Sequence, residues 1–152
     1  MVSEAVHEGD AWPEIHAKIL ASGILVIASP TWRGQPSSVA KRVLERMDAM
    51  LSETDDEGRP VACNRVAGVV VTGNEDGAHQ VISEITGGPQ DIGYTIPGQA
   101  WTYWNQGPGP GPGFLEGGSG HDWSRKTARA MAANLLGVAR ALAARPLGPP
   151  PQ

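Results

Sequence analysis

The sequence predicts an α/β fold in which a parallel sheet carries helices on both faces. Two uninterrupted apolar runs, Ile24–Ala28 and Val66–Thr72, are typical of parallel strands that are covered on both sides. Segments with the apolar spacing of amphipathic helices precede, separate and follow these runs. Such alternation of helices and strands favours a parallel sheet with right-handed crossovers, which leaves few topologies open.

The helices are predicted from apolar spacing and from the residues that flank them. Asp10 can cap the first helix, which has Pro13 in its first turn and ends at Gly23. Asp122 or Ser124 can cap the last helix, which runs to about Ala144. The predicted apolar faces are Trp12, Ile15 and Ile19; Val39, Val43, Met47 and Met50; Ala78, Val81, Ile82 and Ile85; and Met131, Leu135, Val138 and Leu142.

Glycine and proline set the remaining boundaries. The run Gly87–Pro89 is expected to end the third helix. A third strand is predicted over Tyr94–Tyr103, and its interruption by Pro97 and Gly98 indicates an edge position or a bulge. The following segment, residues 104–120, is expected to be a long loop that serves as a lid or a partner surface, or else a disordered insertion.

Composition excludes several classes of function. The chain has 152 residues, a net charge of −4 and no basic cluster, which argues against nucleic acids and anionic membranes as partners. Its single cysteine, Cys63, cannot form an internal disulfide, so we expect an inert thiol and a cytoplasmic location. Residues 1–145 are expected to form one domain and residues 146–152 a disordered proline-rich tail.

Three segments resemble a known family. Ser29–Pro36 (SPTWRGQP), Thr72–Gly77 (TGNEDG) and the aromatic stretch Trp101–Trp104 are similar to the flavodoxin-like NAD(P)H-dependent FMN reductases. The resemblance implies a three-layer sandwich with strand order 2-1-3-4-5 and FMN at the carboxyl ends of the strands. Only strands three to five have counterparts here. We therefore expect an N-terminally incomplete domain without the first strand, the phosphate-binding loop and the second strand.

The resemblance also implies the residues that contact FMN. The backbone of Thr31–Gly34 would run along the isoalloxazine ring and donate N–H groups to it, while the flavin itself carries the chemistry. No catalytic side chain and no metal are therefore expected. The implied cofactor-binding residues are Ser29, Pro30, Thr31, Trp32, Arg33, Gly34, Thr72, Gly73, Asn74 and Gly77.

Each of these roles has a plainer alternative. Both loops can be ordinary turns, with Glu75 and Asp76 serving only the cap and dipole of the next helix. Trp32 can stack on a ring or simply pack in a surface cleft. Arg33 can meet the phosphates of a nicotinamide cofactor or lie in solvent. His79 can face the cofactor, although a surface or packed histidine is the more common case.

The predicted function is that of an FMN-dependent oxidoreductase, which transfers electrons from NAD(P)H through FMN to a small acceptor. The alternative is a non-catalytic module that binds protein partners through the exposed edge of Ile24–Ala28 and the Trp/Gly/Pro loop of residues 104–120. The exposed apolar edge also predicts a homo-oligomer. A hydrolase ranks last, because Gly117–His121 (GGSGH) lacks the pattern of a nucleophile elbow.

Overall fold

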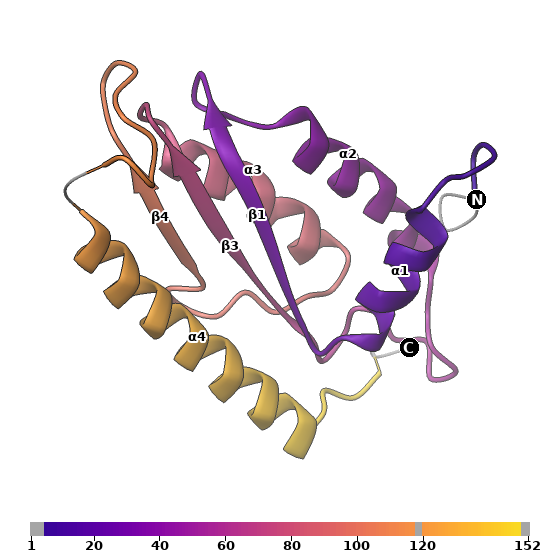
Figure 1. Cartoon of the computed structure of the whole chain (residues 1–152). Coiled ribbons are helices and arrows are strands. Elements are labelled where there is room, and N and C mark those ends of the chain that lie inside the picture. Colours follow the sequence, from indigo (N-terminus) through magenta and orange to yellow (C-terminus); the bar gives the residue numbers. More distant parts are fainter. Residues whose placement is uncertain (1–4, 118–119, 150–152) are drawn as a thin grey trace.

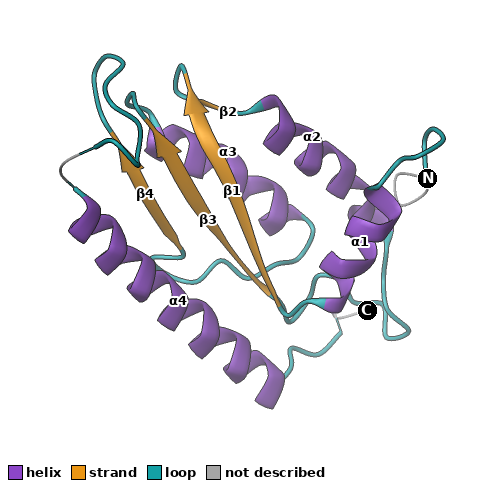
Figure 2. Cartoon of the chain, viewed as in Figure 1, coloured by secondary structure: helices purple, strands orange, loops and turns teal. Residues whose placement is uncertain are grey.

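The computed structural model describes residues 5–117 and 120–149, which form three layers around one sheet (Figures 1 and 2). Helices α2 (Ser38–Met47) and α3 (Ala78–Asp91) cover one face, and α4 (His121–Ala144) crosses the other face. Helix α1 (Trp12–Ala21) packs beside α2 and the short 3-10 helix η1 (Asp48–Ser52). None of the described helices is both long enough and apolar enough to span a membrane.

The sheet has the order β2-β1-β3-β4. Strands β1 (Ile24–Trp32), β3 (Val66–Gly73) and β4 (Trp101–Asn105) are parallel and follow one another in chain order. The two-residue strand β2 (Gln35–Pro36) pairs antiparallel with the end of β1. The predicted α/β class and its parallel sheet are therefore confirmed, and the carboxyl ends of the three parallel strands meet at one edge.

Two strands differ from their predicted bounds. The strand predicted from the apolar run Ile24–Ala28 is longer than expected, because β1 continues to Trp32 and its ladder with β3 extends to the pair Pro30 and Thr72. The third strand was expected over Tyr94–Tyr103, but regular pairing begins only at Trp101. Pro97 lacks a ladder donor and Gln99 has a left-handed φ of 55°, so the chain cannot run as a regular strand before Trp101.

Two helix boundaries also differ. Helix α3 continues through Gly87–Pro89 to Asp91, where a stop was expected. Gly88 lies against Leu44 of α2, and Pro89 is fully buried, so close packing offsets the helix bond that proline removes. Helix α4 begins after Gly120, and neither Asp122 nor Ser124 caps it. The Ser124 hydroxyl instead donates to the Tyr103 carbonyl at 2.7 Å and so ties α4 to the outer strand.

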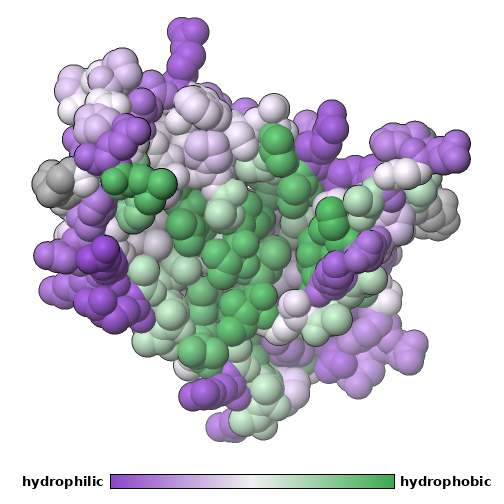
Figure 3. Space-filling view, viewed as in Figure 1, coloured by the Kyte–Doolittle hydropathy of each residue, from purple (hydrophilic) through white to green (hydrophobic). Residues whose placement is uncertain are grey.

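The core is divided unequally between the two faces of the sheet. The larger cluster lies between the sheet and α1, α2 and α3, and the smaller one lies under α4. Helix α4 leaves much of β1 uncovered, and Val26 on this face is 43% exposed. Figure 3 shows apolar side chains gathered across the middle of this side of the molecule.

The edge of β1 is open as well. Among the described residues, β1 pairs with β3 along its length and with β2 only at Thr31 and Trp32. The segment Ile24–Pro30 therefore has no strand partner on its outer side, as expected from the sequence.

A carboxylate joins α1 to α2. Asp10 accepts hydrogen bonds from the backbone N–H groups of Val6 and Trp12, both at 3.0 Å. Its other partner is the Arg46 guanidinium of α2, at 2.9 Å. These hydrogen bonds, led by the one from Val6, lower the pKa of Asp10 to about 2. Asp10 thus bonds the first N–H of α1, although the position before the helix belongs to Ala11 rather than Asp10.

This geometry predicts how Asp10→Asn changes stability with pH. An unfolded aspartate has a pKa of about 3.9, so the folded state gains from the ionised Asp10 above that pH and loses the gain as the pH falls toward 2. Thermal unfolding followed by circular dichroism should show a lower midpoint for Asp10→Asn at pH 7, and the deficit should fade between about pH 4 and pH 2. The exposed pair Glu14–Lys18 supplies the control Glu14→Gln, which should change little. An Asp10→Asn deficit that persists at pH 2 would contradict this account.

Candidate functional site

A tight hairpin closes the carboxyl end of β1. Trp32 pairs with Gln35 across a two-residue turn, and both turn residues are left-handed, with φ of 52° at Arg33 and 73° at Gly34. This is the pattern of a type I′ turn, in which an arginine at the first position is unusual. The Trp32 side chain is 60% exposed at the end of the strand.

A second loop, Gly73–Gly77, lies directly against this hairpin. A Cβ atom added to Gly77 would lie 2.5 Å from the Gly34 Cα, and one added to Gly73 would overlap the Thr31 side chain. The Thr31 hydroxyl also donates to the Asp76 carbonyl at 3.3 Å. The two loops that the sequence singled out, more than 40 residues apart, therefore form one continuous surface because glycine allows their backbones to approach.

The Glu75 carboxylate connects the same two loops. One of its oxygens accepts a hydrogen bond from the backbone N–H of Arg33. The expectation that Glu75 and Asp76 serve the cap of α3 is wrong, because Gly77 occupies the cap position and no side chain bonds there. Sequence reasoning missed the role of Glu75 because its partner lies 42 residues away in the chain.

Several predicted site residues hold the loops in place and do not face outward. Ser29 is buried, donates to the Pro30 carbonyl at 2.7 Å and accepts from the Ser37 N–H at 3.0 Å. Ser37 in turn caps α2 by accepting from the Ala40 N–H. The Thr31 side chain is only 1% exposed. The hydroxyl groups of Ser29 and Thr31 therefore position the hairpin, and the exposed residues at its tip are Trp32, Arg33 and Gln35.

The long loop after β4 forms a third wall at this edge. The Gln106 N–H donates to the Gly73 carbonyl at 3.2 Å, and the Gly111 N–H donates to the Asn74 carbonyl at 2.7 Å. The beginning of the loop is thus ordered against the second loop. Residues 118 and 119 of the segment expected to be a lid lie outside the described residues.

Aromatic residues gather on both sides of β4. Trp104 is buried under the long loop, where Phe114 packs edge-on against it at 5.5 Å and His121 lies 5.6 Å away. On the opposite face, His79 packs edge-on against Tyr103 at 5.0 Å and Trp101 at 5.5 Å. His79 is therefore a packed surface histidine in this structure.

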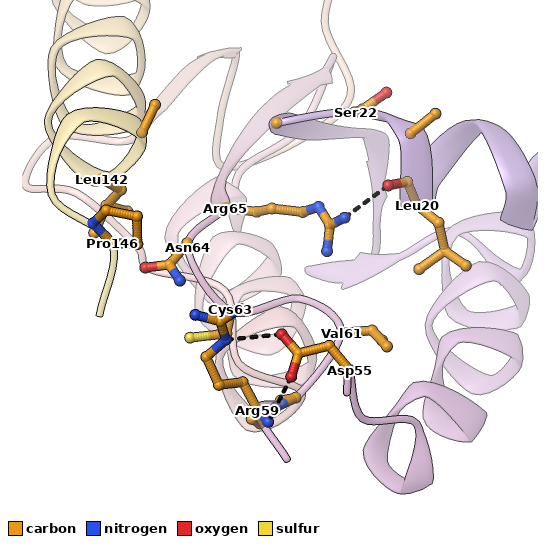
Figure 4. Close-up of a pocket in the computed structure, with 14 residues that line it drawn as sticks. Leu20, Ser22, Asp55, Arg59, Val61, Cys63, Asn64, Arg65, Leu142 and Pro146 are labelled. Carbon is orange, nitrogen blue, oxygen red and sulfur yellow. Dashed lines mark hydrogen bonds and ion pairs between the residues drawn. The ribbon is translucent and has the colours of Figure 1, made fainter. Parts of the chain in front are cut away.

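Two cavities lie at opposite ends of the sheet. A small pocket of about 180 Å³ adjoins Thr72 at the carboxyl edge. A larger cavity of about 610 Å³ lies at the amino ends of the strands, and none of the ten predicted residues lines it. Figure 4 shows that its arginines are already engaged, Arg59 with the Asp55 carboxylate at 2.7 Å and Arg65 with the Leu20 carbonyl at 2.8 Å. This cavity is therefore remote from the loops that the sequence singled out.

The carboxyl edge presents backbone groups where the two loops meet. The glycines at positions 34, 73 and 77 place backbone, without side chains, where the two loops meet. The Arg33 amide is directed at an acceptor, since the Glu75 oxygen occupies that position. An acceptor atom of a ligand takes this N–H only when the Glu75 oxygen gives it up.

Comparison with known proteins gives a consistent result. The family model described as NADPH-dependent FMN reductase matches residues 1–86. The chain is 37% identical over 140 residues to the 8-demethyl-8-aminoriboflavin-5'-phosphate synthase of Streptomyces davaonensis, a match that covers 91% of this chain and 54% of that protein. It is 38% identical over 138 residues to a Mycobacterium bovis protein described as the divalent metal cation transporter MntH, covering 89% of this chain and 20% of that protein.

Solved structures share the arrangement. RosB with the bound intermediate OHC-RP (8-demethyl-8-formylriboflavin-5'-phosphate) superposes with a TM-score of 0.87 at 36% identity, over 95% of this chain and 58% of that one. The Trp repressor binding protein of Bacillus subtilis shares the fold alone, with a TM-score of 0.53 at 18% identity over 84% of this chain and 71% of that one. The chain spans about half the length of the Streptomyces relative and a fifth of the Mycobacterium protein.

Two glycine substitutions should have opposite effects on stability, one at the contact between the loops and one on an exposed helix face. Gly73→Ala should destabilise the fold by about 2 kcal/mol, because the new methyl group overlaps the buried Thr31 side chain. Gly87→Ala, on the exposed face of α3 with nothing nearby, should stabilise it by about 0.5–1 kcal/mol. Urea unfolding measures both free energies. Equal stability of Gly73→Ala and the parent chain would show that the loops are not in close contact.

Proposed function

Because the chain belongs to the NADPH-dependent FMN reductase family, we propose that it is the ring-binding part of a flavin-dependent oxidoreductase that uses NAD(P)H and a small electron acceptor. The direct packing of the hairpin against the second loop, at the carboxyl ends of β1 and β3, is the observation that carries this proposal. Open α/β sheets bind their ligands at that edge. The RosB structure, which holds a riboflavin phosphate derivative, supports the choice of ligand.

Bound FMN would supply the transfer of hydride and electrons, and this chain would supply position and polarity. The Arg33 amide would donate to an acceptor atom of the ring after the Glu75 carboxylate gives up that bond. Trp32, exposed beside it, offers its indole face for stacking. Gly34 has open space where a side chain would stand, and Gly73 and Gly77 let the second loop pack against the hairpin. This division of roles needs no acid–base pair in the protein.

The proposal predicts weak but measurable flavin binding by this chain. The ring contacts alone should give a dissociation constant on the order of 1 μM or weaker, measured by quenching of FMN fluorescence. Trp32→Ala should weaken binding by about tenfold, because an aromatic contact is lost. Trp123→Ala removes a tryptophan that is 45% exposed outside the two loops and should have no effect.

NAD(P)H should bleach the flavin absorbance of the loaded protein if the chain also supports the reaction. If Trp32→Ala and Trp123→Ala lose the same amount of FMN affinity, FMN does not bind at the hairpin. A chain that binds no FMN at any concentration tested would rule out the flavin proposal for this chain.

A second candidate function is that of a protein-binding module without catalysis. The open edge at Ile24–Pro30 and the uncovered apolar face beside it are what favour it, since exposed edges pair with other chains.

This second candidate predicts self-association or co-purification with a partner. Light scattering after size exclusion should show a species larger than one chain, and Val26→Lys, in the uncovered face, should shift it toward the monomer. Val39→Lys replaces a residue of α2 that is 72% exposed and serves as the matched control. A stable monomer over a wide range of concentrations would count against both the module and the expected homo-oligomer.

A further inference from the structure

The small pocket beside Thr72 is distinct from the hairpin and from the second loop. Its volume is about 180 Å³, and it lies between β3, β4, α4 and the long loop. Val70 and Thr72 contribute from β3, Trp104 from β4, Ala128 from α4 and Phe114 from the loop. Thr72 pairs with Pro30 on one side and Trp104 on the other, so the pocket opens at the same edge of the sheet as the hairpin.

The Ser124 and Thr102 hydroxyl groups at this pocket bond within the protein, while Thr72 and Arg125 also line it and the rest of the lining is apolar or aromatic. The Ser124 hydroxyl donates to the Tyr103 carbonyl at 2.7 Å. The Thr102 hydroxyl bonds the Ser124 carbonyl at 3.0 Å and the Thr127 hydroxyl at 2.7 Å. An ordered water molecule needs two to four polar partners, which these groups do not offer. The pocket therefore favours an apolar occupant.

The size of the pocket fits one six-membered ring. An apolar cavity of about 150 Å³ is enough to bind benzene in a protein interior. Here the walls include the Trp104 ring, which Phe114 holds edge-on at 5.5 Å. Phe114, which is 39% exposed, lines the pocket from the long loop. An aromatic ring inside would gain both burial and ring–ring contacts.

We propose that this pocket receives the dimethylbenzene ring of the flavin. The inference rests on the proposed function, because it takes the ligand to be FMN. Of the rings of FMN, the dimethylbenzene ring has no hydrogen-bonding group, whereas the pyrimidine ring carries carbonyl and imide groups that would be left unpaired here. The assignment leaves the polar end of the flavin to the backbone amides of the loops.

The test uses one substitution that fills the pocket and one that does not. Ala128→Leu adds a side chain to the pocket wall, and Ala132→Leu adds the same side chain to an exposed position of the same helix. Two ligands are compared, o-xylene and FMN. o-Xylene is followed through the NMR signals of Trp104 and FMN through its fluorescence. Each variant is first checked for cooperative thermal unfolding, and Phe114→Ala, which removes the outer wall, replaces Ala128→Leu if that chain does not fold.

The expected result is that o-xylene shifts the Trp104 signals in the parent chain and in Ala132→Leu but not in Ala128→Leu. FMN affinity should fall by about tenfold in Ala128→Leu and stay unchanged in Ala132→Leu. FMN binding that Ala128→Leu leaves intact, or o-xylene that never reaches Trp104, would overturn the inference and leave the proposed function standing. Entry of o-xylene without FMN binding in any variant would overturn the proposed function and the assignment of the ring to flavin.

Discussion

The contact between the hairpin and the second loop is the constraint on which the site depends. Gly73 and Gly77 have no side chains, so Thr31 and Gly34 can approach them closely enough to make a single surface. Thr31 and Glu75 then lock the two loops through hydrogen bonds to backbone groups. With a larger residue at either glycine, the tips of β1 and β3 would be forced apart, and the shared surface at the carboxyl edge would be lost.

The remainder of the fold serves this edge unevenly. Helices α2 and α3 cover one face of the sheet and hold β1 and β3 in register from behind. On the other face α4 is fastened at both ends, through Ser124 to Tyr103 and through Leu147 to the Asn64 side chain at 2.7 Å. Between α4 and the open edge of β1, Val26 remains exposed. The edge that carries the site is thus well supported on the α3 side and accessible on the other.

The parts of the fold that the sequence predicts are those determined by neighbours in the chain. Apolar runs identified β1 and β3, and helical spacing identified the four helices, because burial imposes those periods directly. The errors occurred where a contact with a residue distant in the sequence determines where an element ends. Helix α3 passes through Gly87–Pro89 because α2 packs against it, and β1 outlasts its apolar run because β3 continues to pair with it.

The candidate site shows the same division. The two glycine-containing loops were recognised because turn residues mark them locally, but the bond from Arg33 to Glu75 joins residues with no common sequence pattern. Likewise, Phe114 stands in a run of glycine and proline that carries no periodic signal, yet it forms a wall of the pocket beside Thr72. Backbone contacts between separate loops leave no trace in composition, so these features require the three-dimensional structure.

Two hydrogen bonds between Asn64 and Leu147 fix the path of the chain after α4. Asn64 lies two residues before the start of β3, and its side chain bonds both the N–H and the carbonyl of Leu147. Material joined after Leu147 would therefore depart from the end of the sheet that is farthest from the hairpin. A fluorescent label, a surface tether or a fused protein could be attached there and leave the opposite end unobstructed.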